Sequence, residues 1–172
     1  MITLCLAFIY VIFLSYTYGW GAVSLLKKAT GISTDQHITI CLIGLATITT
    51  LGSFFSLFFR INWEFQVLLL VGGIIIFILA KPYKNLVLDK MNPKTFFTWS
   101  AFVLILIVTG IIIYMTSLIP ANPDTGIYHA QTIHWIEDYP VIPGLANLHT
   151  RLGYNSSWLL LNAIFSFSYL GV

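Results

Sequence analysis

Charged residues are scarce in this sequence. Of its 172 residues, 8 are Lys or Arg and 6 are Asp or Glu. Charged residues therefore make up 8% of the chain, against about 25% in a typical soluble domain. So few charges cannot cover the surface of a soluble domain, and a disordered chain would need more of them. The net charge of +2 is too small to indicate a nucleic-acid partner. An integral membrane protein is the class that remains.

Cysteine is also scarce, which excludes a disulfide framework and a paired-cysteine metal site. Cys5 and Cys41 both lie in apolar runs, where a free cysteine behaves as a small hydrophobic residue. Hydrophobic residues are abundant instead, at 58% of the chain.

Long apolar runs divide the chain. A spanning helix needs about 20 apolar residues, and four runs in residues 1–119 approach or exceed this length. A fifth begins near Ser157 and continues to Val172, so we expect 157–172 to be the truncated start of another span. The sequence predicts an all-α polytopic transmembrane helix bundle of about five spans. The four complete runs are Ile2–Leu26, Ile38–Phe59, about Phe65–Ala80 and Phe96–Ile119.

The six lysines predict the orientation of these spans. Lys27 and Lys28 follow the first run, and the other four lysines lie between 81 and 94, after the third run. Basic residues in short loops mark the cytoplasmic side. We therefore expect a multi-pass protein of the inner (plasma) membrane. Its N-terminus and its 120–156 loop would be extracytoplasmic, and membrane lipids would be its partners.

The loop 120–156 contains three of the four histidines and three of the six acidic residues. Asp124 follows Pro123 and precedes a helical pattern, so it is either a helix N-cap or a reactive carboxylate beside the membrane. A helix is expected over 125–139, where Tyr128, Trp135 and Tyr139 share one face. Such a helix is typical of the membrane interface, with His134, Glu137 and Asp138 on its water-facing side.

The remaining polar groups of the loop indicate no metal or cofactor. His129 and His134 are five residues apart and fall on different faces of a helix, whereas chelation favours a spacing of three or four. Arg151 is either an interfacial cation whose charged end reaches water or a ligand for a lipid phosphate or pyrophosphate.

The loop also carries a family resemblance. Asp124, Tyr128-His129, Trp135-Ile136, the run 143–149 (PGLANLH) and the run 151–157 (RLGYNSS) resemble a family of uncharacterised bacterial polytopic membrane proteins. That family is similar to the GT-C superfamily of integral-membrane glycosyltransferases. The resemblance implies a polyprenyl-phosphate sugar donor, with Asp124 as the catalytic acidic residue after a span. It also implies that this chain is the N-terminal part of a longer protein with further spans.

Two functions follow. In the first, Asp124 is the general base of a glycosyltransferase, and Tyr128, His129 and Arg151 contact the substrate. In the second, the chain is a non-catalytic multi-pass subunit or a transporter fragment. The expected span interiors carry no charges, which argues against an ion pathway.

Overall fold

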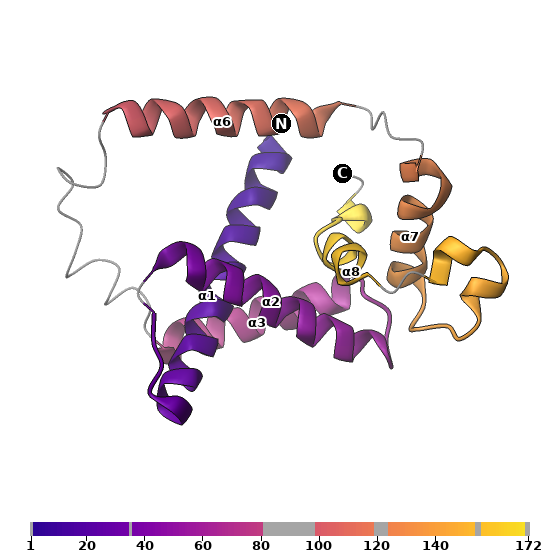
Figure 1. Ribbon diagram of the computed structural model, residues 1–172, viewed down its shortest axis with the longest axis horizontal. Coiled ribbons are helices and arrows are strands. Elements are labelled where there is room, and N and C mark those ends of the chain that lie inside the picture. Colours follow the sequence, from indigo (N-terminus) through magenta and orange to yellow (C-terminus); the bar gives the residue numbers. More distant parts are fainter. Residues whose placement is uncertain (1, 35, 81–98, 119–123, 154–155, 171–172) are drawn as a thin grey trace. The chain divides into compact units, whose positions relative to one another are not determined.

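The computed structural model describes residues 2–34, 36–80, 99–118, 124–153 and 156–170. Within these ranges every regular element is helical, which confirms the all-α prediction (Figure 1). The α-helices are α1 (Ile2–Thr30), α2 (His37–Ser56), α3 (Trp63–Ala80), α6 (Trp99–Ser117), α7 (Ala130–Asp138) and α8 (Ser157–Ile164). The shorter turns are the π-helical η1 (Thr125–His129) and the 3-10 turns η2 (Leu145–Asn147), η3 (Thr150–Gly153) and η4 (Ser168–Leu170).

The chain forms two compact units. Residues 1–80 and 123–172 make the first, and residues 81–122, with α6, make the second. Two helical segments, Thr3–Thr30 and His37–Ser56, are long and apolar enough to cross a membrane. The other expected spans correspond to shorter apolar stretches, Trp63–Leu79, Leu106–Thr116 and Ser157–Leu170. The structure therefore supports membrane-spanning length for two of the five runs.

Small residues allow α1 and α2 to pack with their backbones in close contact. A Cβ atom added at Gly44 of α2 would lie 2.6 Å from the carbonyl carbon of Ser15 and 2.8 Å from the backbone nitrogen of Gly19, both in α1. Only glycine leaves room for such an approach, as is common between membrane helices. Ser15 donates its hydroxyl to Val11 O at 2.6 Å, so this polar group is satisfied within its own helix.

A small apolar core joins α1, α2, α3 and α8. Leu14, Ile48, Ile61 and Ile164 are each at most 1% exposed and belong to the same buried cluster. The hydroxyl of Tyr18 donates to the carbonyl oxygen of Leu69 at 3.0 Å and links α1 to α3. Many other apolar side chains on these helices are exposed, as expected for surfaces that face lipid or further helices.

Two backbone hydrogen bonds fix α7 and its following loop against the turn between α2 and α3. Ile61 N–H donates to Ile136 O at 2.9 Å, and Val141 N–H donates to Ser56 O at 2.8 Å. These bonds bring together segments that lie more than 70 residues apart in the sequence. Residues 124–153 are consequently held by hydrogen bonds against the end of α2 and the α2–α3 turn.

Helix α8 begins at Ser157, where the fifth apolar run was expected to begin, and ends at Ile164. The chain then turns through Phe167, whose φ is 52°, and Ser168 N–H donates to Ser166 Oγ at 3.3 Å. Serine side chains compete with helical hydrogen bonds in this way. The helix is therefore shorter than the apolar run that contains it.

Candidate functional site

Asp124 stands at the N-cap position of the helical segment that begins with η1, as its place after Pro123 suggested. Its side chain makes no capping hydrogen bond. Instead, its Oδ1 atom accepts a hydrogen bond from Nη1 of Arg151 at 2.9 Å. The two side chains are 40% and 45% exposed, respectively, so the ion pair faces solvent and contributes at most about 1 kcal/mol to stability. The carboxylate is oriented toward a cation and not toward the helix N–H groups.

The turn η3 carries Arg151 to this position. Gly144 adopts a φ of 90°, a conformation that residues with a side chain rarely adopt, and reverses the chain just before η2. The Pro143-Gly144 pair predicts this turn. Within η3, the backbone N–H of Arg151 donates to His149 Nδ1 at 3.2 Å. The helical segment formed by η1 and α7 is called the loop helix. The turns η2 and η3 return the chain to the start of this helix, where Arg151 meets Asp124, 27 residues earlier in the sequence.

Tyr128 contacts both of these charged groups. Its hydroxyl donates a long hydrogen bond of 3.4 Å to Oδ2 of Asp124. The guanidinium carbon of Arg151 lies 5.2 Å from the centre of the Tyr128 ring, within the range of a cation–π interaction. The ring of His129 contacts that of Tyr128 edge to face, with 4.2 Å between ring centres. The structure thus brings together all four residues that sequence analysis assigned to catalysis and substrate binding. These residues, which form the charged cluster, are Asp124, Tyr128, His129 and Arg151.

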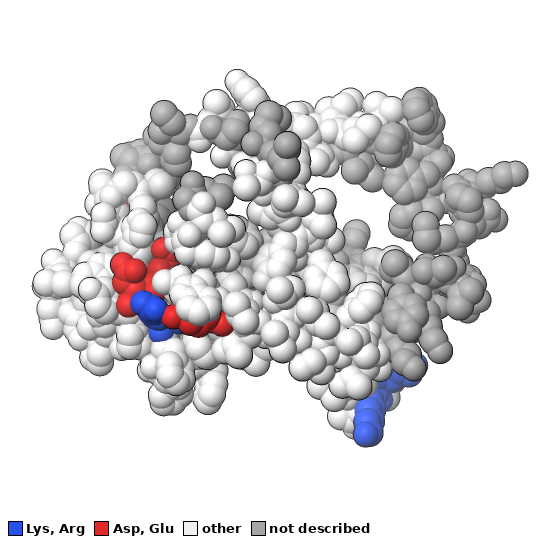
Figure 2. All heavy atoms as spheres, turned by 180° about the vertical axis from the view of Figure 1, so that it is seen from behind, with Lys and Arg blue, Asp and Glu red and all other residues white. Residues whose placement is uncertain are grey.

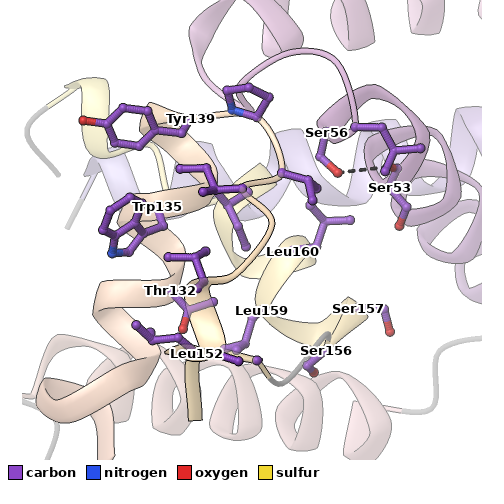
Figure 3. Close-up of a pocket in the computed structure, with 18 of the residues that line it drawn as sticks. Ser53, Ser56, Thr132, Trp135, Tyr139, Leu152, Ser156, Ser157, Leu159 and Leu160 are labelled. Carbon is purple, nitrogen blue, oxygen red and sulfur yellow. Dashed lines mark hydrogen bonds between the residues drawn. The ribbon is translucent and has the colours of Figure 1, made fainter. Parts of the chain in front are cut away.

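A cavity of about 820 Å³ opens between α2, α7, the following loop and α8. None of the four residues of the cluster lines it, but Leu152 and Gly153, which follow Arg151, do. In Figure 3, Thr132 and Trp135 come from α7, Tyr139 directly follows it, Ser53 and Ser56 come from α2, and Leu159 and Leu160 from α8. The rings of Trp135 and Tyr139 pack together with 5.2 Å between centres. Two of the three aromatic residues expected at the membrane interface therefore line a cavity.

The cavity wall is less polar than its residue types suggest. Thr50, Ser53 and Thr132 donate their hydroxyls to backbone carbonyls four residues earlier in the chain. Ser56 donates to Ser53 O, as the dashed line in Figure 3 shows. Because these hydroxyl protons are already used, a ligand meets mainly hydrocarbon and aromatic surface. An apolar chain suits such a wall better than a sugar does.

The cavity and the charged cluster share two structural elements. Arg151 precedes Leu152 and Gly153 in η3, and these two residues line the cavity. On the loop helix, the Thr132 hydroxyl donates to Tyr128 O at 2.7 Å. Thr132 lines the cavity, and Tyr128 belongs to the charged cluster. A ligand with an apolar tail and an anionic head would therefore find both complementary surfaces on η3 and on the loop helix.

One residue of α7 differs from its expected exposure. His134 and Asp138, assigned to the water-facing side, are exposed, but Glu137, assigned to the same side, is only 5% exposed. The cause is tertiary. The backbone bond from Ile61 to Ile136 and the packing of α7 on α8 cover Glu137.

Charged side chains are otherwise confined to a few places. On the face seen in Figure 2, acidic groups and a basic group gather in one mixed cluster, another basic group lies apart, and the remaining described surface is uncharged. The ion pair Arg60–Glu64, with 2.6 Å between Nη2 and Oε1, belongs to the same end of the unit as α7. The hydrogen bond from Arg60 lowers the pKa of the Glu64 carboxyl.

The comparison with protein families gives a match over the whole chain. A family model described as a domain of unknown function (DUF8201) matches residues 1–172. The chain belongs to this family. No curated protein and no solved structure matches the DUF8201 chain. Its function must therefore be inferred from the site.

Some features of the DUF8201 site were not predictable from the residue pattern. The cavity depends on the approach of α2 to α7 and α8, and nothing in its serines and threonines distinguishes them from residues that pack helices. Nothing in the residue pattern indicated that Glu137 would be buried, because an acidic residue near a helix end is normally exposed. Within the residues that the structure describes, no group of three or more His, Cys, Asp and Glu is placed to hold a metal ion.

Proposed function

We propose that this DUF8201 chain is the N-terminal part of a multi-pass membrane protein that transfers a sugar from a polyprenyl phosphate at the outer face of the inner membrane. In this proposal the chain contributes about five spans of a GT-C-like glycosyltransferase. The 120–156 loop is extracytoplasmic, and the partners are membrane lipids and the remaining spans of a longer protein.

The contacts around α7 support the proposed topology. The lysine distribution places the turn between α2 and α3 and the 120–156 loop on the same, outer side of the membrane. The structure joins these two segments by the hydrogen bonds of Ile61 with Ile136 and of Val141 with Ser56. Segments on opposite sides of a bilayer about 30 Å thick could not make these bonds.

The observation that carries the functional proposal is the Asp124–Arg151 pair beside an apolar cavity. The cavity provides a surface for the first isoprene units of a lipid-linked donor. The guanidinium of Arg151 has five N–H donors, and Asp124 accepts a bond from Nη1. A phosphate can bind such a planar group through two parallel hydrogen bonds. Tyr128 and His129 flank the position where the sugar–phosphate bond would lie.

The proposed reaction uses the ion pair as a resting contact. When the donor phosphate binds Arg151, the guanidinium shifts from Asp124 to the phosphate and releases Oδ1. Asp124 then accepts the proton of the acceptor hydroxyl, and the hydroxyl oxygen bonds to the anomeric carbon of the sugar. The bond from that carbon to the phosphate oxygen breaks, and Arg151 stabilises the charge on the departing polyprenyl phosphate.

The ion pair between Asp124 and Arg151 also supports a second, non-catalytic function. Asp124 and Arg151 neutralise each other and connect the two ends of the loop, as a purely structural ion pair would. The chain would then be a non-catalytic subunit or a transporter fragment, with the loop as a folded cover on the outer surface. In that case the carboxylate has no proton to accept.

Asp124→Asn separates the two functions. Asparagine keeps an oxygen that can accept from Arg151, so the fold should be retained, but it cannot act as a base. Transfer from a polyprenyl-phosphate sugar by the full-length protein in membranes should fall by roughly 10²-fold or more. Asp138→Asn, the same change at an exposed position of the same loop, is the control and should remain active. If Asp124→Asn transfers sugar at the wild-type rate, the catalytic role is wrong and the non-catalytic function is favoured.

A further inference from the structure

Glu137 is a buried carboxylate in unfavourable electrostatic surroundings. Its side chain is 6% exposed. Its Oε2 atom lies 3.5 Å from Nδ1 of His134, whose side chain is 62% exposed. Its Oε1 atom is buried and accepts no hydrogen bond from any residue that the structure describes. A buried carboxylate oxygen without a partner is costly, so this atom calls for an explanation.

The ends of two helices add to the negative potential at this point. Glu137 lies in the last turn of α7, and Ala163, on the wall of the same narrow cavity, lies in the last turn of α8. Unpaired carbonyl groups give a helix C-terminus a partial negative charge, which favours a cation there and disfavours an acidic residue. Neither helix end therefore compensates the carboxylate.

The remaining wall of this cavity consists largely of neutral polar groups, and several of them present oxygen. Its lining residues include Ser166, Ser168 and Tyr169, whose side chains carry hydroxyl groups, and Asn62 and Gln66, whose side chains carry amides. The amide of Gln66 is already committed: its Nε2 donates to Ile164 O, and its Oε1 accepts from the Tyr10 hydroxyl at 3.0 Å. Each hydroxyl group has an oxygen that can coordinate a cation and a proton that it can donate.

No lysine or arginine among the described residues lies within ion-pair distance of Glu137. Arg60 is nearby in the sequence of the α2–α3 turn, but its guanidinium contacts Glu64. The cavity is also too narrow to admit a water-sized sphere. A compact bare ion fits this space better than an organic ligand or a hydrated ion does.

We propose that the carboxylate of Glu137, with the hydroxyls of Ser166, Ser168 and Tyr169, binds one small monovalent cation of the size of Na⁺. Oxygen atoms are the ligands that hard cations prefer. A monovalent ion matches the single carboxylate, whereas calcium sites usually combine several carboxylate and carbonyl oxygens. The ion would connect the end of α7 to η4 and so hold the outer loop on the membrane-embedded helices.

Binding of sodium by the purified full-length protein in detergent tests this site. Radioactive Na⁺ should bind with about one ion per chain and should not be displaced by choline. At constant ionic strength and pH, replacing choline by Na⁺ should raise the midpoint of thermal unfolding by roughly 5 °C when Na⁺ is about a hundredfold above its Kd. Glu137→Gln should abolish both effects.

Two further variants make the result specific. Asp138→Asn removes the same charge one residue later, at an exposed position, and should bind Na⁺ as the wild type does. Ser168→Ala removes one neutral oxygen ligand, keeps the buried charge and should weaken Na⁺ binding by roughly tenfold. This variant decides the question if Glu137→Gln does not fold.

Several results would overturn the site. These are unchanged Na⁺ binding in Glu137→Gln, equal loss of binding in Asp138→Asn, or stabilisation by Ca²⁺ in place of Na⁺. Stabilisation by acid with no response to Na⁺ would show that a proton, and not a metal ion, satisfies Glu137. The binding measurement does not depend on glycosyl transfer, so it remains informative if the proposed enzymatic function is wrong.

Discussion

The close contact between α1 and α2 makes Gly44→Ala a sensitive test of the fold. The added Cβ atom would lie 2.6 Å from the carbonyl carbon of Ser15 and 2.8 Å from the nitrogen of Gly19. Both neighbours are backbone atoms of a helix, so neither can move aside by a change of rotamer. The two helices must separate instead.

The size of the effect follows from that separation. The Cβ atom would lie closer still to the carbonyl oxygen of Ser15. The helices must therefore move apart by at least the roughly 0.8 Å that lengthens the 2.6 Å contact with the carbonyl carbon to an ordinary 3.4 Å. A gap of this size removes about a quarter to a half of the dispersion energy of each contact that it opens. Leu14 and Ile48, both fully buried, lie on the two helices that must separate. Overpacking a buried contact costs about 1–3 kcal/mol, and we expect the upper end because the clash is with backbone.

Thermal unfolding of the protein in detergent measures the change. A loss of about 3 kcal/mol lowers the unfolding midpoint by roughly 6–12 °C in a chain of this size. Gly126→Ala is the matched control, because a Cβ atom at Gly126 would meet no described atom within 4 Å. It should leave the midpoint unchanged or raise it slightly. If Gly44→Ala and Gly126→Ala unfold at the same temperature, α1 and α2 do not pack as described.

Two more predictions concern topology and the cavity. In a protein without Cys5 and Cys41, Gly126→Cys should react with a membrane-impermeant maleimide in intact cells, and Ser33→Cys should react only after permeabilisation; the reverse pattern would invert the proposed orientation. Ser53→Trp places an indole in the 820 Å³ cavity and should raise the KM for a polyprenyl-phosphate donor by roughly tenfold or more, while Ser24→Trp, at an exposed position of α1, should not. Equal KM values in the two variants would mean that the donor does not enter this cavity.

The helical class and the approximate position of most helices follow from the sequence alone. The apolar run that begins at Ile38 corresponds to α2, and the pattern over 125–139 corresponds to η1 and α7. These predictions succeed because helix formation depends on hydrogen bonds between residues four apart and on the periodicity of apolar side chains, both of which are local. The Pro143-Gly144 turn is predictable for the same reason, since Gly144 alone provides the positive φ.

The sequence also singled out Asp124, Tyr128, His129 and Arg151, but as separate candidates. Their residue types indicate acid–base chemistry and phosphate binding, and those indications require no coordinates. The choice between an N-cap and a reactive carboxylate for Asp124 was open at that level, because both interpretations use the same residue at the same position. The two-turn path through η2 and η3 brings Arg151 to within 2.9 Å of it.

The burial of Glu137 on α7 depends on tertiary contacts that the sequence pattern does not specify. Helical periodicity distinguishes an aromatic face from a polar one, but it does not say which other elements will cover either face. Ile61 of the α2–α3 turn bonds to Ile136, and α8 packs on the same helix. As a result Glu137 is buried while apolar residues elsewhere on the loop helix are exposed. Contacts between segments that are distant in sequence set this arrangement, because the free energy of burying a side depends on the partner that covers it and not on the helix alone.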